Sequence, residues 1–247
     1  MLRLNELVSW MWFVVVVVAP LRGAEMEGRG RIIVQTQVLR QEANGLSGTL
    51  ELLLDERLTA SVREKLWGVG DWSLVLAPES ATYRAFASRP PTSALLRVVD
   101  VNGAVVSKRE LERPLAKLEA WGSVSNRDRY FLLTEDLSAG FGSYSGLATT
   151  LVEVKRGSIH ESEACDSDSH RKERFRLMKG IRSDWRITRR DSGGEILSVS
   201  SHPKDSLGFV TEYLRYRYDG RQWQVYKREV AGSWTSDEPF PQRAVFR

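Results

Sequence analysis

Cysteine and histidine are scarce in this chain. Its 247 residues include one cysteine and three histidines. Cys165 has no second cysteine with which to form an internal disulfide bond, so the apolar core must stabilise the fold. The histidines, His160, His170 and His202, lie in no recognisable catalytic motif, and the chain has no CxxC pair. These absences exclude a disulfide-stapled scaffold and a structural zinc site of known spacing.

A strong excess of charge of either sign is also missing. The chain has 36 basic and 32 acidic residues, which gives a formal net charge of +4. Residues 1–24 contain Arg3, Arg22 and Glu6, so the chain without them carries +3. This excess is too small to indicate a nucleic-acid-binding protein. It does permit contact with an anionic polymer, so we expect an unknown envelope component or a polyanion as partner, and no nucleic acid.

Long apolar runs are absent except near the N-terminus. Leu7–Ala19 is 13 residues long and carries no charge, which is short for a bilayer span of about 20 residues. It fits the apolar part of a secretory signal peptide, 1–24, with cleavage after Ala24. Arg22 stands where a small residue is preferred, so an uncleaved anchor is the alternative. We predict a periplasmic or secreted protein that touches the membrane only through an uncleaved N-terminal segment.

What the chain does contain is a series of strand patterns joined by glycine turns. Apolar segments flank Asn102-Gly103, Arg156-Gly157 and Asp219-Gly220. Asn-Gly and Asp-Gly are strong hairpin signals, because a type I′ turn needs positive φ at both central residues. We expect a mainly β fold, an antiparallel hairpin-rich sandwich or barrel-like domain with one or two short helices. It would be a single domain over 25–247, and 88–93 is where two lobes would divide.

Two local patterns predict secondary structure in the first third of the chain. Apolar residues recur at i, i+4 and i+8 within 55–67, which predicts a helix with Asp55 as its capping residue. The segment 72–78, WSLVLAP, is apolar and ends in a proline, which predicts a strand.

The third hairpin can be predicted residue by residue. A two-residue turn would pair Tyr218 with Arg221 and Tyr216 with Trp223. Side chains alternate across a strand, so Tyr216, Trp223 and Val225 would share one face. We predict that this aromatic and apolar face lies in the core.

The segment 134–146, TEDLSAGFGSYSG, is the most prominent candidate for a functional loop. Its glycines do not match a dinucleotide fingerprint, and no helical pattern follows to hold a phosphate. A tyrosine stands where a nucleophile elbow needs serine. A calcium site would begin with the alternate oxygen ligands Asp136 and Ser138. The main expectation is a binding or structural loop whose shape depends on Gly140, Gly142, Tyr144 and Gly146.

The polar segment 160–170 contains three weak candidates for metal ligands. His160, Cys165 and His170 are evenly spaced, with four carboxylates between them. Imidazole, thiolate and carboxylate all bind zinc, but this spacing matches no structural zinc pattern. We expect an exposed, mobile loop.

The segment 171–190 is strongly basic, with nine Lys or Arg in 20 residues. Its apolar residues could line one side of a helix. We expect a short helix followed by a strand with a solvated basic face. Contact with an anionic membrane or a polyanion is the alternative.

Three motifs together carry a resemblance. TEDLSAGFGSYSG, YRYDGRQW and the tail WTSDEPFPQRAVF resemble a set of uncharacterised exported bacterial proteins, which share a Gly-Ser-Tyr loop, a YxYDGxxW hairpin and an acidic tail. The resemblance covers 90–247 and leaves the N-terminal third uncovered. It implies a bacterial, envelope-associated protein and brings no known activity.

These observations favour an exported β-rich protein that binds or scaffolds without catalysis and needs no cofactor. One alternative is an envelope hydrolase with a site near Asp136 and Ser143, and with His202 as a further member. The other is a domain stabilised by calcium at Asp136.

Overall fold

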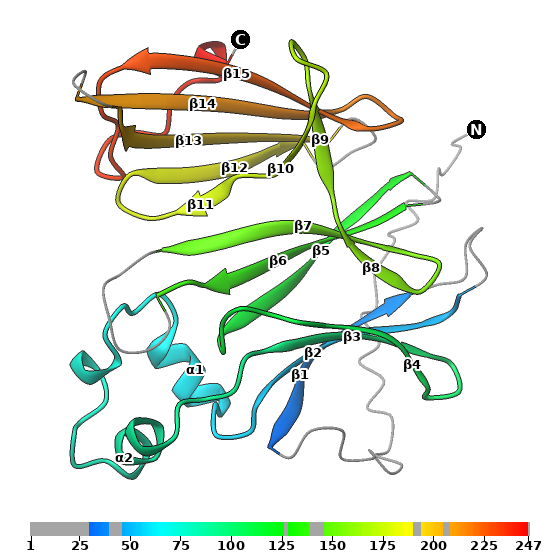
Figure 1. The fold of residues 1–247 in the computed structure, drawn as a ribbon, viewed down its shortest axis with the longest axis vertical. Helices are drawn as coiled ribbons and strands as arrows, with labels where there is room; N and C mark the ends of the chain where they lie inside the picture. The colour runs from blue at the N-terminus through cyan, green and yellow to red at the C-terminus, as the bar shows by residue number, and fades with distance from the viewer. Residues whose placement is uncertain are drawn as a thin grey trace, which may run out of the picture.

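The structure is a computed structural model that describes residues 30–39, 46–125, 128–138, 146–189, 194–204 and 208–246. The predicted signal segment therefore lies outside the described residues. Strands dominate the rest and form three sheets, which stack as three layers in Figure 1. The prediction of a mainly β, antiparallel, sandwich-like fold with two short helices is confirmed. The described strands do not close into a barrel.

The N-terminal sheet is antiparallel and has the order β1-β2-β3-β4. Its strands are β1 (Arg31–Leu39), β2 (Gly48–Asp55), β3 (Leu95–Asp100) and β4 (Val105–Glu110). Between β2 and β3 the chain forms α1 (Ala60–Leu66), the 3-10 turn η1 (Trp72–Leu74) and α2 (Ala81–Ser88). Both helices lie together at one end of this sheet (Figure 1).

The central sheet has the order β11-β7-β6-β5, and β8 also pairs with β7. Its strands are β5 (Ala116–Ser125), β6 (Asp128–Asp136), β7 (Leu147–Lys155), β8 (Ser158–Glu161) and β11 (Leu177–Lys179).

The C-terminal sheet has the order β10-β9-β15-β14-β13-β12. Its strands are β9 (Glu163–Asp166), β10 (Lys172–Arg174), β12 (Ser183–Arg189), β13 (Glu195–Pro203), β14 (Phe209–Tyr218) and β15 (Trp223–Ala231). The chain continues into the short 3-10 turn η3 (Arg243–Phe246).

The central sheet is buried on both faces, and β6 shows why. Successive side chains of a strand point to opposite faces. Phe131 and Leu133 pack into the core shared with the N-terminal sheet. Tyr130 and Leu132 pack into a second core shared with the C-terminal sheet. A strand that is apolar on both sides can therefore serve as the middle layer.

The C-terminal segment covers the outer face of the C-terminal sheet. Trp234 and Phe246 form a third apolar cluster with residues of β13 that include Val199. The guanidinium of Arg243 donates to both oxygens of the buried Glu195 carboxylate at 2.8 and 2.9 Å. This ion pair fixes the end of the chain to the sheet.

The hairpin of β14 and β15 confirms the predicted core face and corrects the predicted register. Tyr216, Trp223 and Val225 are each at most 2% exposed. The turn spans 219–222, because Asp219 accepts two backbone N–H bonds within it at 2.8 and 2.9 Å. Tyr216 therefore lies opposite Val225 rather than Trp223. The displacement is two residues, so each side chain keeps its face.

The three glycine turns join the expected strands with unexpected geometry. Arg156-Gly157 has positive φ at both residues, 50° and 79°, as a type I′ turn requires. At Asn102-Gly103 and Asp219-Gly220 only the glycine has positive φ. An aspartate organises each of these two turns, since Asp100 also accepts backbone N–H bonds within its turn. Side-chain capping therefore replaces the type I′ conformation there.

In the first third of the chain, α1 confirms the helix predicted within 55–67, but its predicted cap and the strand predicted at 72–78 are wrong. The helix begins only at Ala60, because Asp55 ends β2 and its carboxylate binds Arg57 and the N–H of Thr92. The segment 72–78 begins with a 3-10 turn instead of a strand, because the side chain of Asp71 accepts a bond from the N–H of Ser73, the second residue of the turn, and caps it.

The basic and polar segments are also more regular than predicted. Residues 160–170 belong to β8, β9 and a tight turn in which Asp166 accepts N–H bonds from Asp168 and Ser169. The segment 171–190 forms β10, β11 and β12 and contains no helix up to residue 189. Pairing with β9, β7 and β13 outweighs the helical spacing of its apolar residues. None of the helices in the described parts of the chain is long and apolar enough to cross a membrane.

Candidate functional site

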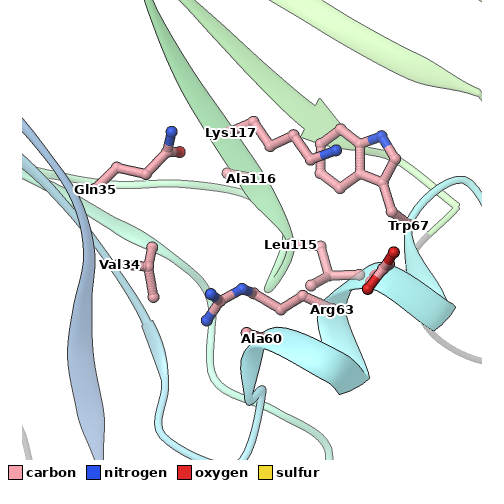
Figure 2. A pocket seen from close by; sticks show the side chains of 9 residues that line it. Val34, Gln35, Ala60, Arg63, Trp67, Leu115, Ala116 and Lys117 are labelled. Carbon is pink, nitrogen blue, oxygen red and sulfur yellow. The ribbon is translucent and has the colours of Figure 1, made fainter.

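A cleft of about 350 Å³ lies between α1, β1 and the beginning of β5. We call it the α1 cleft. Figure 2 shows its apolar residues, Val34 from β1, Ala60 from α1, and Leu115 and Ala116 at the start of β5. Leu115 and Ala116 are buried, whereas Ala60 is exposed at the mouth. The volume is at the lower end of the range for small-molecule sites.

Charged side chains line the rest of the α1 cleft. Arg63 and Glu64 come from α1, and Lys117 comes from β5. Arg63 donates one bond, at 2.9 Å, to the carbonyl of Leu58. Its other N–H groups have no partner among the described residues, and the guanidinium lines the same cleft as Val34 (Figure 2). The cleft therefore offers a planar group of donors next to an apolar surface.

Trp67 and Lys117 form another wall of the same cleft. Trp67 directly follows α1 and is half-buried. The ammonium of Lys117 lies 3.9 Å from the centre of a Trp67 ring. Both side chains are drawn in Figure 2. This cation–π contact is worth roughly 0.5–1 kcal/mol at an exposed site. A ligand could displace the lysine from the ring at a small cost and then use both groups.

Gln35 connects the two sheet edges above the cleft. Its amide nitrogen donates to the carbonyl of Leu118 at 3.0 Å, and its amide oxygen accepts from the N–H of Leu118 at 2.8 Å. A side-chain carboxamide from β1 thus occupies the place of a neighbouring strand beside β5. Sequence reasoning did not identify this bridge, because a single Gln in a strand has no distinctive signal.

Asp136, predicted as a calcium ligand or a catalytic residue, holds two walls of the α1 cleft. It is fully buried. One carboxylate oxygen accepts from the N–H of Gly68 at 2.7 Å. The other accepts from the N–H and hydroxyl of Ser138 at 3.1 and 2.5 Å. The backbone N–H of Asp136 donates to Leu115 at 3.0 Å. Asp136 therefore ties the residue after Trp67 to the base of the cleft.

Glu135 points to the other side of β6 and holds the preceding loop. Its carboxylate accepts from the N–H groups of Glu112 and Arg113 at 2.9 and 3.2 Å. Burial raises its pKa above the usual value, although these two hydrogen bonds act in the opposite direction. Adjacent carboxylates on one strand thus anchor different segments and do not face one substrate together.

A second cavity, of about 330 Å³, contains two of the predicted metal candidates. His160 on β8 and Cys165 on β9 both line it, together with the buried Glu153. The ammonium of Lys155 forms an ion pair with this carboxylate, with Nζ 2.7 Å from Oε1. His170 does not line this cavity and lies in the turn after β9.

The remaining predicted site residues are not brought together. Across the described ranges, no group of three His, Cys, Asp or Glu side chains is close enough to hold a metal ion. His202 lies on β13, in a different sheet from Asp136. Gly140, Gly142, Ser143 and Tyr144 lie outside the described residues.

Gly146 is the one glycine of the predicted loop that the structure describes. Its φ is +93°, and a Cβ atom there would lie 2.4 Å from the carbonyl oxygen of Lys179. Its own carbonyl accepts from the N–H of Leu137 at 3.1 Å. Gly146 is therefore required where the loop enters β7 beside β11, which is a structural role.

Comparison of the chain with protein-family models, with curated proteins and with solved structures finds no significant match.

Proposed function

We propose that this chain is an exported bacterial envelope protein that binds a small organic anion in the α1 cleft and does not catalyse a reaction. The single observation that carries the proposal is the pairing of an apolar base with Arg63 and Lys117 in one cleft. An apolar body and an anionic group would be recognised by these two parts respectively. Export is supported by the apolar N-terminal pattern and by the resemblance of the C-terminal two thirds.

The cleft residues favour binding over catalysis. The side chains that line it include no histidine, cysteine, serine or aspartate. Its one carboxylate, Glu64, is exposed, and no hydrogen bond from another described residue orients it. General acid–base or nucleophilic catalysis needs a group that is held in position.

The hydrogen bonds that hold the walls of the cleft are consistent with a preformed site. Asp136 fixes the backbone on both sides of it, at Gly68 and at Leu115. Gln35 fixes the spacing between β1 and β5. A ligand would therefore find the walls in place and would lose little affinity to ordering them.

Fluorescence titration tests the proposal. A panel of small aliphatic and aromatic carboxylates is added to the wild-type protein and to Trp67→Phe, and the tryptophan emission is recorded. Binding in the α1 cleft predicts a saturable change in the wild type that is much smaller in Trp67→Phe. If every saturable change persists in Trp67→Phe, or none occurs, the α1 cleft is not the binding site.

A further inference from the structure

Ala116 directs both of its backbone polar groups away from β6. It lies opposite Glu135 in the ladder, and the N–H of Asp136 donates to the carbonyl of Leu115 at 3.0 Å. Along an antiparallel pair, hydrogen-bonded and non-hydrogen-bonded residue pairs alternate. Leu115 and Asp136 are bonded, so the next pair, Ala116 and Glu135, does not exchange hydrogen bonds. The N–H and C=O of Ala116 therefore point along the free edge of β5, on the side of the α1 cleft.

Across the described ranges, no strand pairs with β5 on this edge, so neither group takes part in a bond between strands. Ala116 is 4% exposed, so bulk water has little access to it. Buried backbone N–H and C=O groups nearly always have a hydrogen-bond partner in a folded protein. The wall of the cleft therefore presents one donor and one acceptor that a bound molecule can satisfy.

Gln35 shows what kind of group fits this edge. Two residues further along β5, its carboxamide satisfies the N–H and the C=O of Leu118 at once. The partner of such an edge must present an acceptor and a donor on the same side. An α-amino acid residue with an acylated nitrogen does so through its N–H and its carboxyl oxygen, as residues of an antiparallel pair do.

The charges around Ala116 select among such residues. Arg63 and Lys117 face the cleft, against one exposed carboxylate, Glu64. A terminal carboxylate is favoured by the two cations, and Arg63 has free donors for its second oxygen. A free α-ammonium group would be repelled, whereas an acylated nitrogen is neutral and keeps an N–H.

We propose that the α1 cleft binds an N-acylated α-amino acid with an apolar side chain, either free or as the C-terminal residue of a peptide. This inference rests on the proposed function and names its ligand class. The ligand N–H donates to the C=O of Ala116, and one carboxylate oxygen accepts from its N–H. The second oxygen binds Arg63, and the side chain packs on Val34 and Leu115.

Isothermal titration calorimetry with four matched probes tests the inference. N-acetyl-L-leucine has every group that the cleft would recognise. Its N-methyl derivative lacks only the N–H, N-acetyl-L-leucine amide lacks the carboxylate charge, and free leucine has a charged amine. We expect each of the three to bind at least about tenfold more weakly, the loss typical of one charged or buried hydrogen bond.

Two variants locate the interaction. Arg63→Gln should lower the affinity for N-acetyl-L-leucine by about tenfold and should leave the affinity for N-acetyl-L-leucine amide unchanged. Arg84→Gln, on the exposed side of α2, is the matched control and should change neither. An acetylated pentapeptide ending in leucine distinguishes a free N-acylated amino acid from the C-terminus of a peptide. If the pentapeptide binds more tightly than N-acetyl-L-leucine, the ligand is a peptide terminus.

Equal affinity for N-acetyl-L-leucine and its N-methyl derivative would overturn the pairing with Ala116. Absence of N-acetyl-L-leucine binding would also overturn the inference. In either case, the proposed function would still hold if other carboxylates gave a saturable change of fluorescence that depends on Trp67.

Discussion

The carboxylate of Asp136 accepts a hydrogen bond from the backbone N–H of Gly68, 2.7 Å away and 68 positions earlier in the chain. Gly68 has φ of +75° and follows Trp67, which is a wall of the α1 cleft. The bond therefore joins the end of β6 to the end of α1. It makes the shape of the cleft depend on a residue that does not line it.

Replacement Asp136→Asn should destabilise the fold and weaken binding in the cleft. An amide presents only one acceptor to three donors, and its NH₂ group faces an N–H at Gly68 or at Ser138. We expect a loss of about 2–3 kcal/mol of unfolding free energy, because buried polar groups lose their partners. Chemical denaturation measures it, with the exposed Asp237→Asn as control. Equal stability of both variants would contradict the anchoring role.

Comparing alanine substitutions at Gly146 and Gly103 distinguishes the effect of steric contact from the effect of backbone strain. Both have positive φ, +93° and +85°, but only at Gly146 would a Cβ meet another atom, the carbonyl oxygen of Lys179 at 2.4 Å. Gly103→Ala should cost about 1 kcal/mol, the usual strain of a left-handed alanine. Gly146→Ala should cost clearly more, because β7 and β11 must separate. Thermal melts compare the two, and similar melting temperatures would refute the close approach.

Trp223 should be among the largest contributors to the core between the central and C-terminal sheets. Its ring lies 5.7 Å from that of Trp121 and 5.4 Å from that of Phe175. Trp223→Ala should lower the unfolding free energy by about 3–5 kcal/mol. Tyr226→Ala, on the opposite face of β15, should cost less than half of that. An unchanged melting temperature for Trp223→Ala would show that the face is misassigned.

The ion pair that fixes the C-terminal segment should make stability depend on pH. Burial acts to raise the pKa of Glu195, but hydrogen bonds from Arg243, Thr188 and Arg215 outweigh it and lower the pKa to about 2. The ordinary pKa of this carboxyl group is 4.5. Because its pKa in the folded protein is lower, the ionised group stabilises the fold when the pH is above 4.5. Its contribution, roughly 3 kcal/mol, is lost as the pH falls from 4.5 toward 2.

Glu195→Gln tests this assignment by its pH profile. The variant should be less stable than the wild type at pH 7, and the difference should shrink as the pH falls through that window. Denaturation at pH 7, 4 and 2.5 measures the difference. A gap that stays constant down to pH 2.5 would mean that Glu195 is not an ionised anchor of Arg243.

The sequence predicted the fold class because its signals are local. The alternation of Tyr216, Trp223 and Val225 depends on strand geometry alone, so the buried face was correct even though the register was not. Helix signals were weaker. The spacing of apolar residues in 171–190 was overruled by strand pairing, which depends on residues far away in the chain.

The candidate site was not predictable in the same way. Asp136 was identified as unusual, but its partner Gly68 lies in another part of the sequence. The cleft combines α1, β1 and β5, and no spacing between Gln35, Arg63 and Lys117 indicates that they meet. Contacts between layers determine the cleft, and a pattern along the chain does not record them.

The most direct test of the central claim is amide chemical-shift mapping by heteronuclear NMR during titration with N-acetyl-L-leucine. The account predicts that the largest shifts occur at Ala116 and its neighbours in β5, and at Arg63 to Gly68 around the end of α1. Shifts confined to β8 and β9, around the second cavity, would contradict it.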